Sequence, residues 1–123
     1  MGIDIGGTSA KFARISASGE LSDQGSFPTG SGQDLDGFLK ELYRITDQAV
    51  EEGILGIGVC CLGIIQTGTG QILGGVENLP FLKGLSLKHL LEERYPDLPV
   101  SVANDVKAVA RGRFNYLHSS YCD

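Results

Sequence analysis

The sequence has no cluster of basic residues: its ten lysines and arginines are scattered through 123 residues, and the formal net charge is −5. Binding nucleic acid by bulk electrostatics needs a basic face, and binding a membrane surface needs a basic amphipathic helix, so neither partner is expected. No apolar run approaches the roughly 20 residues that span a bilayer. The basic region and long apolar core of a signal peptide are also missing, so we expect a cytoplasmic protein.

Cysteine is scarce and unevenly placed, at positions 60, 61 and 122. An odd number with two adjacent members does not make the framework of a disulfide-rich domain, and no Cys-x-x-Cys or His-x₃₋₅-His spacing indicates a zinc site. Glycine, by contrast, is abundant: the chain has 18, roughly twice the usual share of about 7%. This composition indicates many tight turns or close approaches of the backbone.

The rest of the composition is typical of one folded domain, residues 1–123, since 41% of residues are hydrophobic, 20% are charged and no repeat or linker divides the chain. Alternation, helical periodicity and turn residues predict strands over 2–5, 11–15, 21–27, 54–63 and 98–103, a short hairpin near 71–73, and helices over 35–50, after Ser86 and from Asn104 onwards. Ser31 or Asp34 is expected to cap the first helix. Strands alternating with helices predict an α/β domain, whose central sheet is mixed because a β-hairpin opens it.

The first candidate site is the stretch "DIGGTSAK" at 4–11. Asp4 ends a strand, and the bare backbone of Gly6 and Gly7 lets a ligand oxygen approach the main-chain N–H groups closely. Thr8 adds a hydroxyl, and the Asp4 carboxylate suits a hydrated Mg²⁺ that also binds phosphate oxygens. The alternative is an ordinary hairpin turn in which glycine supplies a positive φ. The residues themselves leave both interpretations open.

The second candidate is Asn104-Asp105, where a buried strand is expected to meet the start of a helix. Residues at such junctions often contact ligands in α/β proteins. An ionised Asp105 can accept a proton from a substrate hydroxyl, as the general base does in phosphoryl transfer, and the Asn104 amide suits polyol hydroxyls. The alternative is that these residues simply cap the helix, at a gain of about 1 kcal/mol.

Together, four motifs in this order resemble the ROK family, which comprises repressors, open reading frames and sugar kinases of the actin, hexokinase and heat-shock-chaperone superfamily. The matching segments are "DIGGTSAK" at 4–11, "GVCCLGII" at 58–65, "ENLPFL" at 77–82 and "LPVSVANDVKAVA" at 98–110. Each is weak alone, but together they extend over almost the whole chain. The resemblance implies a ribonuclease H-like lobe of the actin type, with helices packed on its mixed sheet.

The resemblance also implies roles for individual residues. Asp105 corresponds to the catalytic base that takes the proton from the sugar hydroxyl. The loop that meets the phosphates and metal of Mg-ATP corresponds to Asp4, Gly6, Gly7 and Thr8, with Asp4 as the Mg²⁺-linked carboxylate. The sugar side of the site corresponds to Gly63, Glu77, Asn78 and Asn104. Lys11 belongs to the first motif, but we expect it on the strand surface.

Two departures limit what the resemblance implies. Arg113 stands where family members usually carry a glutamate soon after the Asn-Asp pair. Family kinases are also roughly twice as long, and their second half supplies the adenosine pocket, a Glu-x-Gly-His motif and a zinc site, none of which occurs here. We therefore expect the N-terminal lobe of a sugar kinase without its C-terminal lobe. Such a lobe would be inactive alone and would self-associate through its bare cleft face.

Two alternatives to a kinase lobe remain. The first is the sugar-sensing lobe of a ROK-type repressor, in which a helix-turn-helix precedes the first motif. Only three residues precede that motif here, and its phosphate loop is intact, which favours the kinase. The second is an unrelated glycine-rich α/β domain, in which the motifs are only a turn and a cap.

Overall fold

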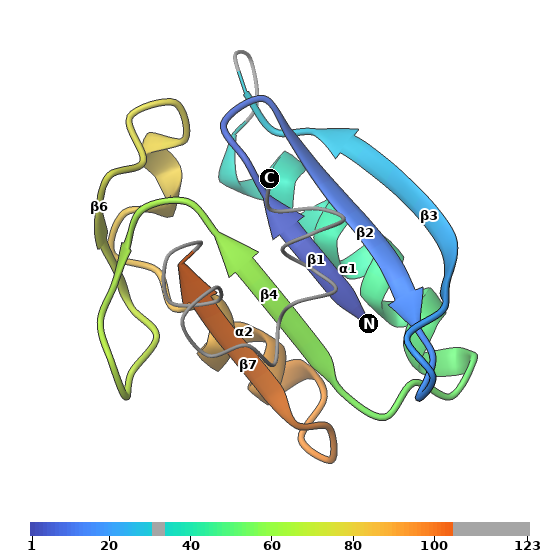
Figure 1. Cartoon of the computed structure of the whole chain (residues 1–123). Helices are drawn as coiled ribbons and strands as arrows, with labels where there is room; N and C mark the ends of the chain where they lie inside the picture. The colour runs from blue at the N-terminus through green and yellow to red at the C-terminus, as the bar shows by residue number, and fades with distance from the viewer. Residues whose placement is uncertain (31–33, 105–123) are drawn as a thin grey trace.

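The computed structural model describes residues 1–30 and 34–104, which form a five-stranded mixed sheet with two α-helices (Figure 1). The strand order across the sheet is β3-β2-β1-β4-β7. The antiparallel part consists of β1 (Gly2–Ile5), β2 (Ser9–Ile15) and β3 (Leu21–Pro28). Two further strands, β4 (Ile57–Cys61) and β7 (Val100–Asn104), run parallel to β1. The predicted mixed sheet opened by a hairpin is therefore confirmed.

Both helices, α1 (Leu35–Glu51) and α2 (Leu87–Arg94), pack on the same face of the sheet (Figure 1). Asp34 caps α1 as expected, because its side chain accepts a hydrogen bond of 2.8 Å from the Gly37 N–H. Ser86 caps α2 in the same way, through the His89 N–H at 3.1 Å. The alternative cap Ser31 and the predicted last helix lie outside the described residues. No helix in the described ranges is long and apolar enough to cross a membrane.

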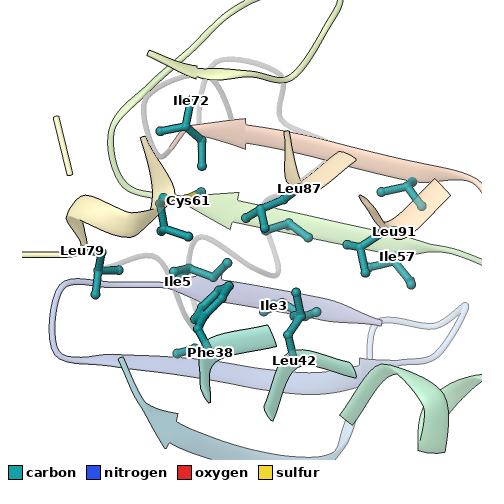
Figure 2. Packing of buried hydrophobic residues seen from close by; sticks show 14 of the residues in the cluster. Ile3, Ile5, Phe38, Leu42, Ile57, Cys61, Ile72, Leu79, Leu87 and Leu91 are labelled. Atoms are coloured by element: carbon teal, nitrogen blue, oxygen red, sulfur yellow. The ribbon is translucent and has the colours of Figure 1, made fainter. Parts of the chain in front are cut away.

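The core lies between the sheet and the two helices, and Figure 2 shows its centre. Alternate residues of β1 and β4 point into it, because successive strand residues face opposite sides of the sheet. The largest contributions are fully buried side chains from β1, α1 and α2, namely Ile3, Ile5, Phe38, Leu42, Leu87 and Leu91. The opposite face carries a smaller cluster of buried residues, Ala13, Cys60 and Ala103.

Several predicted boundaries shift. The strand predicted over 54–63 is limited to β4, and Gly63, two residues after β4, has a left-handed φ of 100°. The predicted short hairpin consists of β5 (Ile64–Ile65) and β6 (Ile72–Gly74). A 3₁₀ turn, η1 (Pro80–Leu82), follows this hairpin.

A polar network joins the end of α2 to the middle of α1. The Arg94 guanidinium binds both carboxylate oxygens of Asp47, at 2.9 and 2.6 Å. The Tyr95 hydroxyl donates to Asp47 and lies 2.6 Å from the hydroxyl of the fully buried Thr46, which bonds the Leu42 carbonyl at 2.9 Å. Every polar side chain in this network is therefore bonded to another part of the same lobe.

Candidate functional site

The ends of three parallel strands place the predicted site residues on one edge of the sheet. Ile5 lies opposite Cys61, and Cys61 lies opposite Asn104, so β1, β4 and β7 end in register. The glycine loop after β1, Gly63 after β4 and Asn104 at the end of β7 consequently lie along the same edge. Neighbouring strands are about 4.8 Å apart, so this edge spans about 10 Å from β1 to β7.

The glycine loop, residues 6–8, turns tightly between β1 and β2. The Gly6 N–H donates to the Ser9 carbonyl at 2.9 Å, which closes the turn and lets β2 begin at Ser9, earlier than predicted. Neither Gly6 nor Gly7 has a left-handed φ, so positive φ does not explain these glycines. A Cβ at Gly6 would lie 3.1 Å from the Ser9 carbonyl oxygen, closer than most real Cβ contacts, and a Cβ at Gly7 would lie 3.0 Å from the Nδ2 of the exposed Asn78 side chain.

Asn78 reaches this loop from a segment more than seventy residues away. The Leu79 N–H donates to the Val76 carbonyl at 2.9 Å, and both of these side chains are buried. This turn leaves Glu77 and Asn78 exposed between two buried anchors. The fold thus brings one predicted sugar contact, Asn78, against the predicted phosphate loop, while in the described part of the chain Glu77 makes no hydrogen bond to that loop.

Gly63 has a structural reason to be glycine. Its φ is 100°, and a Cβ would lie 2.6 Å from the Gly74 carbonyl oxygen and 2.9 Å from the Val76 Cγ1. These distances are shorter than real Cβ contacts, so a side chain here would force the β5–β6 hairpin away from the end of β4. The predicted contact between Gly63 and a sugar is a separate property and stays a prediction.

Asp4 is half-buried on the sheet face opposite the helices. It lies in register with Lys11 on β2 and Cys60 on β4, and its neighbours Ile3 and Ile5 point into the core. Lys11 is exposed on the strand surface, as expected. Within the described ranges, no group of three or more His, Cys, Asp or Glu residues is placed to hold a metal ion. Asp4 would thus act as a single carboxylate, which is the mode that hydrated Mg²⁺ uses when phosphate supplies the other oxygens.

Thr29 is a residue of this site that the sequence analysis missed. It is fully buried just after β3, its hydroxyl donates to the Gly6 carbonyl at 2.8 Å, and its N–H donates to the Thr8 carbonyl at 3.0 Å. In the sequence it belongs to "PTGSGQD", whose composition is that of a loop. In the sequence, the one indication of this role was that Thr29 follows the strand predicted over 21–27, which comes after the strand that follows the glycine loop.

Two residues singled out in the sequence, Asp105 and Arg113, lie outside the described residues. Asn104 is half-buried at the end of β7, next to Asp105 in the chain. The structure therefore positions the strand that leads to the predicted base. The role of Asp105 stays a prediction.

Curated relatives of the chain include sugar kinases. It is 28% identical over its whole length to the N-acetylmannosamine kinase of Escherichia fergusonii, and covers 41% of that protein. It is 32% identical to the glucokinase of Halalkalibacterium halodurans, where the match covers 91% of this chain and 35% of the glucokinase. The chain thus spans about 40% of the length of the curated relatives it matches.

Solved structures show the same fold. A putative N-acetylmannosamine kinase from Listeria monocytogenes matches with a TM-score of 0.73 and 28% identity, over 97% of this chain and 40% of that one. A ROK family glucokinase from Streptomyces griseus, solved with glucose and AMPPNP, matches with a TM-score of 0.72 and 23% identity, over 94% and 36% of the two chains. A ROK family transcriptional regulator matches with a TM-score of 0.70 and 21% identity, over 92% and 29%.

The fold is the actin-like ATPase fold of ROK sugar kinases. The sequence profile of the ROK family matches residues 1–122, nearly the whole chain. This chain belongs to the ROK family.

Proposed function

We propose that the complete protein is an ATP-dependent sugar kinase and that this chain is its N-terminal lobe. The observation that carries the proposal is the shared sheet edge, which holds the glycine loop and Asn104 and has Asn78 against Gly7. The loop is suited to bind phosphate, and the two amide side chains are suited to bind hydroxyls. They lie close enough together for a nucleotide phosphate and a sugar to contact them at the same time. The curated sugar kinases among the relatives support this class of reaction.

On the phosphate side, the chain offers main-chain donors, a hydroxyl and a carboxylate. In the described part of the chain, the Gly7 N–H has no hydrogen-bond partner, and Thr8 is exposed. We assign Gly6, Gly7 and Thr8 to the ATP phosphates and Asp4 to the water shell of Mg²⁺. When bound, Mg²⁺ would neutralise charge on the phosphate oxygens. Phosphoryl transfer depends mainly on such positioning and electrostatic stabilisation.

On the acceptor side, Asp105 is proposed as the general base that accepts the proton of the attacking sugar hydroxyl. Asn104, Asn78, Glu77 and Gly63 are proposed to orient the sugar. The acceptor class is a hexose or an N-acetylated hexosamine, since the relatives include a glucokinase and N-acetylmannosamine kinases. Superfamily kinases react in a cleft that closes between two lobes, so the 123-residue chain alone is expected to have negligible activity.

The test is ADP formation by the complete protein with Mg-ATP and a panel containing glucose, N-acetylmannosamine and related sugars. We expect turnover with at least one of them. Asp105→Asn should lower kcat by about 10²- to 10⁴-fold, because the hydroxyl proton loses its acceptor. Asp97→Asn is the matched control, since Asp97 is an exposed aspartate in the loop before β7 and should not affect the rate.

Sugar binding without ADP formation would contradict the kinase and favour the sugar-sensing repressor lobe. Unchanged turnover in Asp105→Asn would remove Asp105 from the mechanism while leaving the class of reaction intact. Self-association of the lobe stays a prediction. Light scattering tests it, and a monomer at high concentration would contradict it.

A further inference from the structure

The end of β3 touches the glycine loop at three points. The Thr29 N–H binds the Thr8 carbonyl at 3.0 Å, and the Thr29 hydroxyl binds the Gly6 carbonyl at 2.8 Å. Gly30 also lies close to the loop, since a Cβ on Gly30 would lie 3.0 Å from the Gly7 carbonyl oxygen. Thr29 therefore bonds the carbonyl groups of Gly6 and Thr8, and Gly30 leaves room for that of Gly7.

The hydroxyl contact sets the direction of one peptide. The bond between Gly6 and Gly7 is planar and trans, so its C=O and N–H point in opposite directions. Because the Gly6 carbonyl points at the fully buried Thr29 hydroxyl, the Gly7 N–H points away from the interior. Throughout residues 1–30 and 34–104, no protein group accepts a hydrogen bond from that N–H.

We propose that Thr29 is a positioning residue of the phosphate loop: its hydroxyl holds the Gly6–Gly7 peptide so that the Gly7 N–H donates to a phosphate oxygen of ATP. Gly30 is the second part of this device, because it leaves room for the Gly7 carbonyl. The inference rests on the proposed function, in which the loop binds ATP. Thr29 itself touches no ligand and acts only through the loop.

The hydroxyl is the part of Thr29 that this role needs. The backbone N–H of any residue except proline would reach the Thr8 carbonyl, and valine has nearly the same shape as threonine. Valine lacks the donor, however, and would leave the Gly6 carbonyl facing an apolar methyl group. The peptide would then gain by rotating towards water, and a rotated peptide no longer presents the Gly7 N–H to an anion.

The experiment measures the affinity of the complete protein for Mg-AMPPNP by calorimetry. We expect Thr29→Val to weaken binding by about tenfold, and Thr29→Ser, which keeps the hydroxyl, to stay within about threefold of the wild type. The KM for the sugar should not change in either variant. Thr46→Val is the matched control, because Thr46 is also fully buried and bonds a backbone carbonyl, but on α1. It should lower the unfolding temperature without weakening Mg-AMPPNP binding.

A second pair of variants keeps the proposal testable if Thr29→Val does not fold. Gly30→Ala has no left-handed φ to strain, so its effect comes from the new Cβ against the Gly7 carbonyl. It should weaken Mg-AMPPNP binding severalfold. Gly74→Ala, whose Cβ would meet nothing within 4 Å, should leave binding unchanged.

The outcomes separate this inference from the proposed function. If Thr29→Val binds Mg-AMPPNP with the affinity of the wild type, the positioning role alone is overturned. If Thr29→Val does not fold, the same result in Gly30→Ala overturns it. Equal weakening by Thr46→Val would also overturn it, because the effect would then reflect general stability. A wild-type protein that does not bind Mg-AMPPNP would overturn the proposed function and this inference with it.

Discussion

Two polar clusters among the described residues differ in where their hydrogen bonds end. The network of Thr46, Asp47, Arg94 and Tyr95 closes on itself between the two helices. In the glycine loop, Thr29 bonds the carbonyls of Gly6 and Thr8, and the Gly6 N–H bonds the Ser9 carbonyl, while the Gly7 N–H finds no acceptor within the described residues. A cluster that satisfies its own groups stabilises the fold, whereas a rigid loop with an outward donor is suited to a ligand.

Three of the residues with shifted pKa values lie in the closed cluster between the two helices rather than at the candidate site. Hydrogen bonds from Arg94 lower the pKa of Asp47, and the same contact raises the pKa of Arg94. Burial, followed by the bond to Asp47, raises the pKa of Tyr95. Such shifts often indicate a catalytic site, but structural ion pairs produce them too. Here the closed geometry shows that the shifts come from packing α2 on α1.

The largest loss of stability is expected from Gly63→Ala, because the new side chain would disturb the backbone at the sheet edge that carries the candidate site. The new Cβ would lie 2.6 Å from the Gly74 carbonyl oxygen at a φ of 100°, so we expect a loss of about 2–4 kcal/mol in unfolding free energy. Urea denaturation measures this loss. Gly68→Ala is the control, because Gly68 has a φ of 94° with nothing within 4 Å. An equal loss in the two variants would show that the packing of Gly63 against the hairpin is unimportant.

A smaller effect is expected from Tyr95→Phe, which opens the closed cluster. The variant removes the bonds to Asp47 and to the buried Thr46, so we expect a loss of about 1–3 kcal/mol in unfolding free energy. ATP affinity should not change. Tyr43→Phe is the control, since the Tyr43 ring lies 4.1 Å from the Arg94 guanidinium but its hydroxyl has no hydrogen bond in the described part. Weakened ATP binding in Tyr95→Phe would contradict the separation of the two clusters.

The smallest effect is expected in the pH dependence of stability, through the contact between Asp47 and Arg94. The folded pKa of Asp47 lies below its usual value of 3.8, so its contribution to stability is present above that value and is lost as the pH falls through the folded pKa. Unfolding measured between about pH 5 and about pH 2 should therefore be less pH-dependent in Asp47→Asn than in the wild type. The pair is partly exposed and screened by solvent, so the difference should be small. Identical pH profiles would show that the contact between Asp47 and Arg94 contributes nothing.

Local patterns were sufficient to predict most of the described elements, and they brought the glycine loop and Asn104 forward as candidate site residues. The apolar spacing of α1 is independent of the rest of the chain, as are the caps Asp34 and Ser86. The boundaries were less predictable: β2 begins earlier because the Gly6–Ser9 bond tightens the turn, and beyond β4 the backbone at Gly63 turns with a left-handed φ against the Gly74 carbonyl and Val76. Residue spacing does not reveal such backbone bonds and close approaches.

Short motifs were enough to predict the α/β class and the family and to single out the glycine loop and the Asn-Asp pair. Each of these features depends on a short stretch of residues, whose chemistry can be understood without knowing what it contacts in the fold. Only the folded chain shows that Asn78 lies against Gly7, that neither Gly6 nor Gly7 has a left-handed φ, and that the buried Thr29 bonds the loop. The contacts of Asn78 and Thr29 join atoms from distant parts of the chain, and only folding creates such contacts.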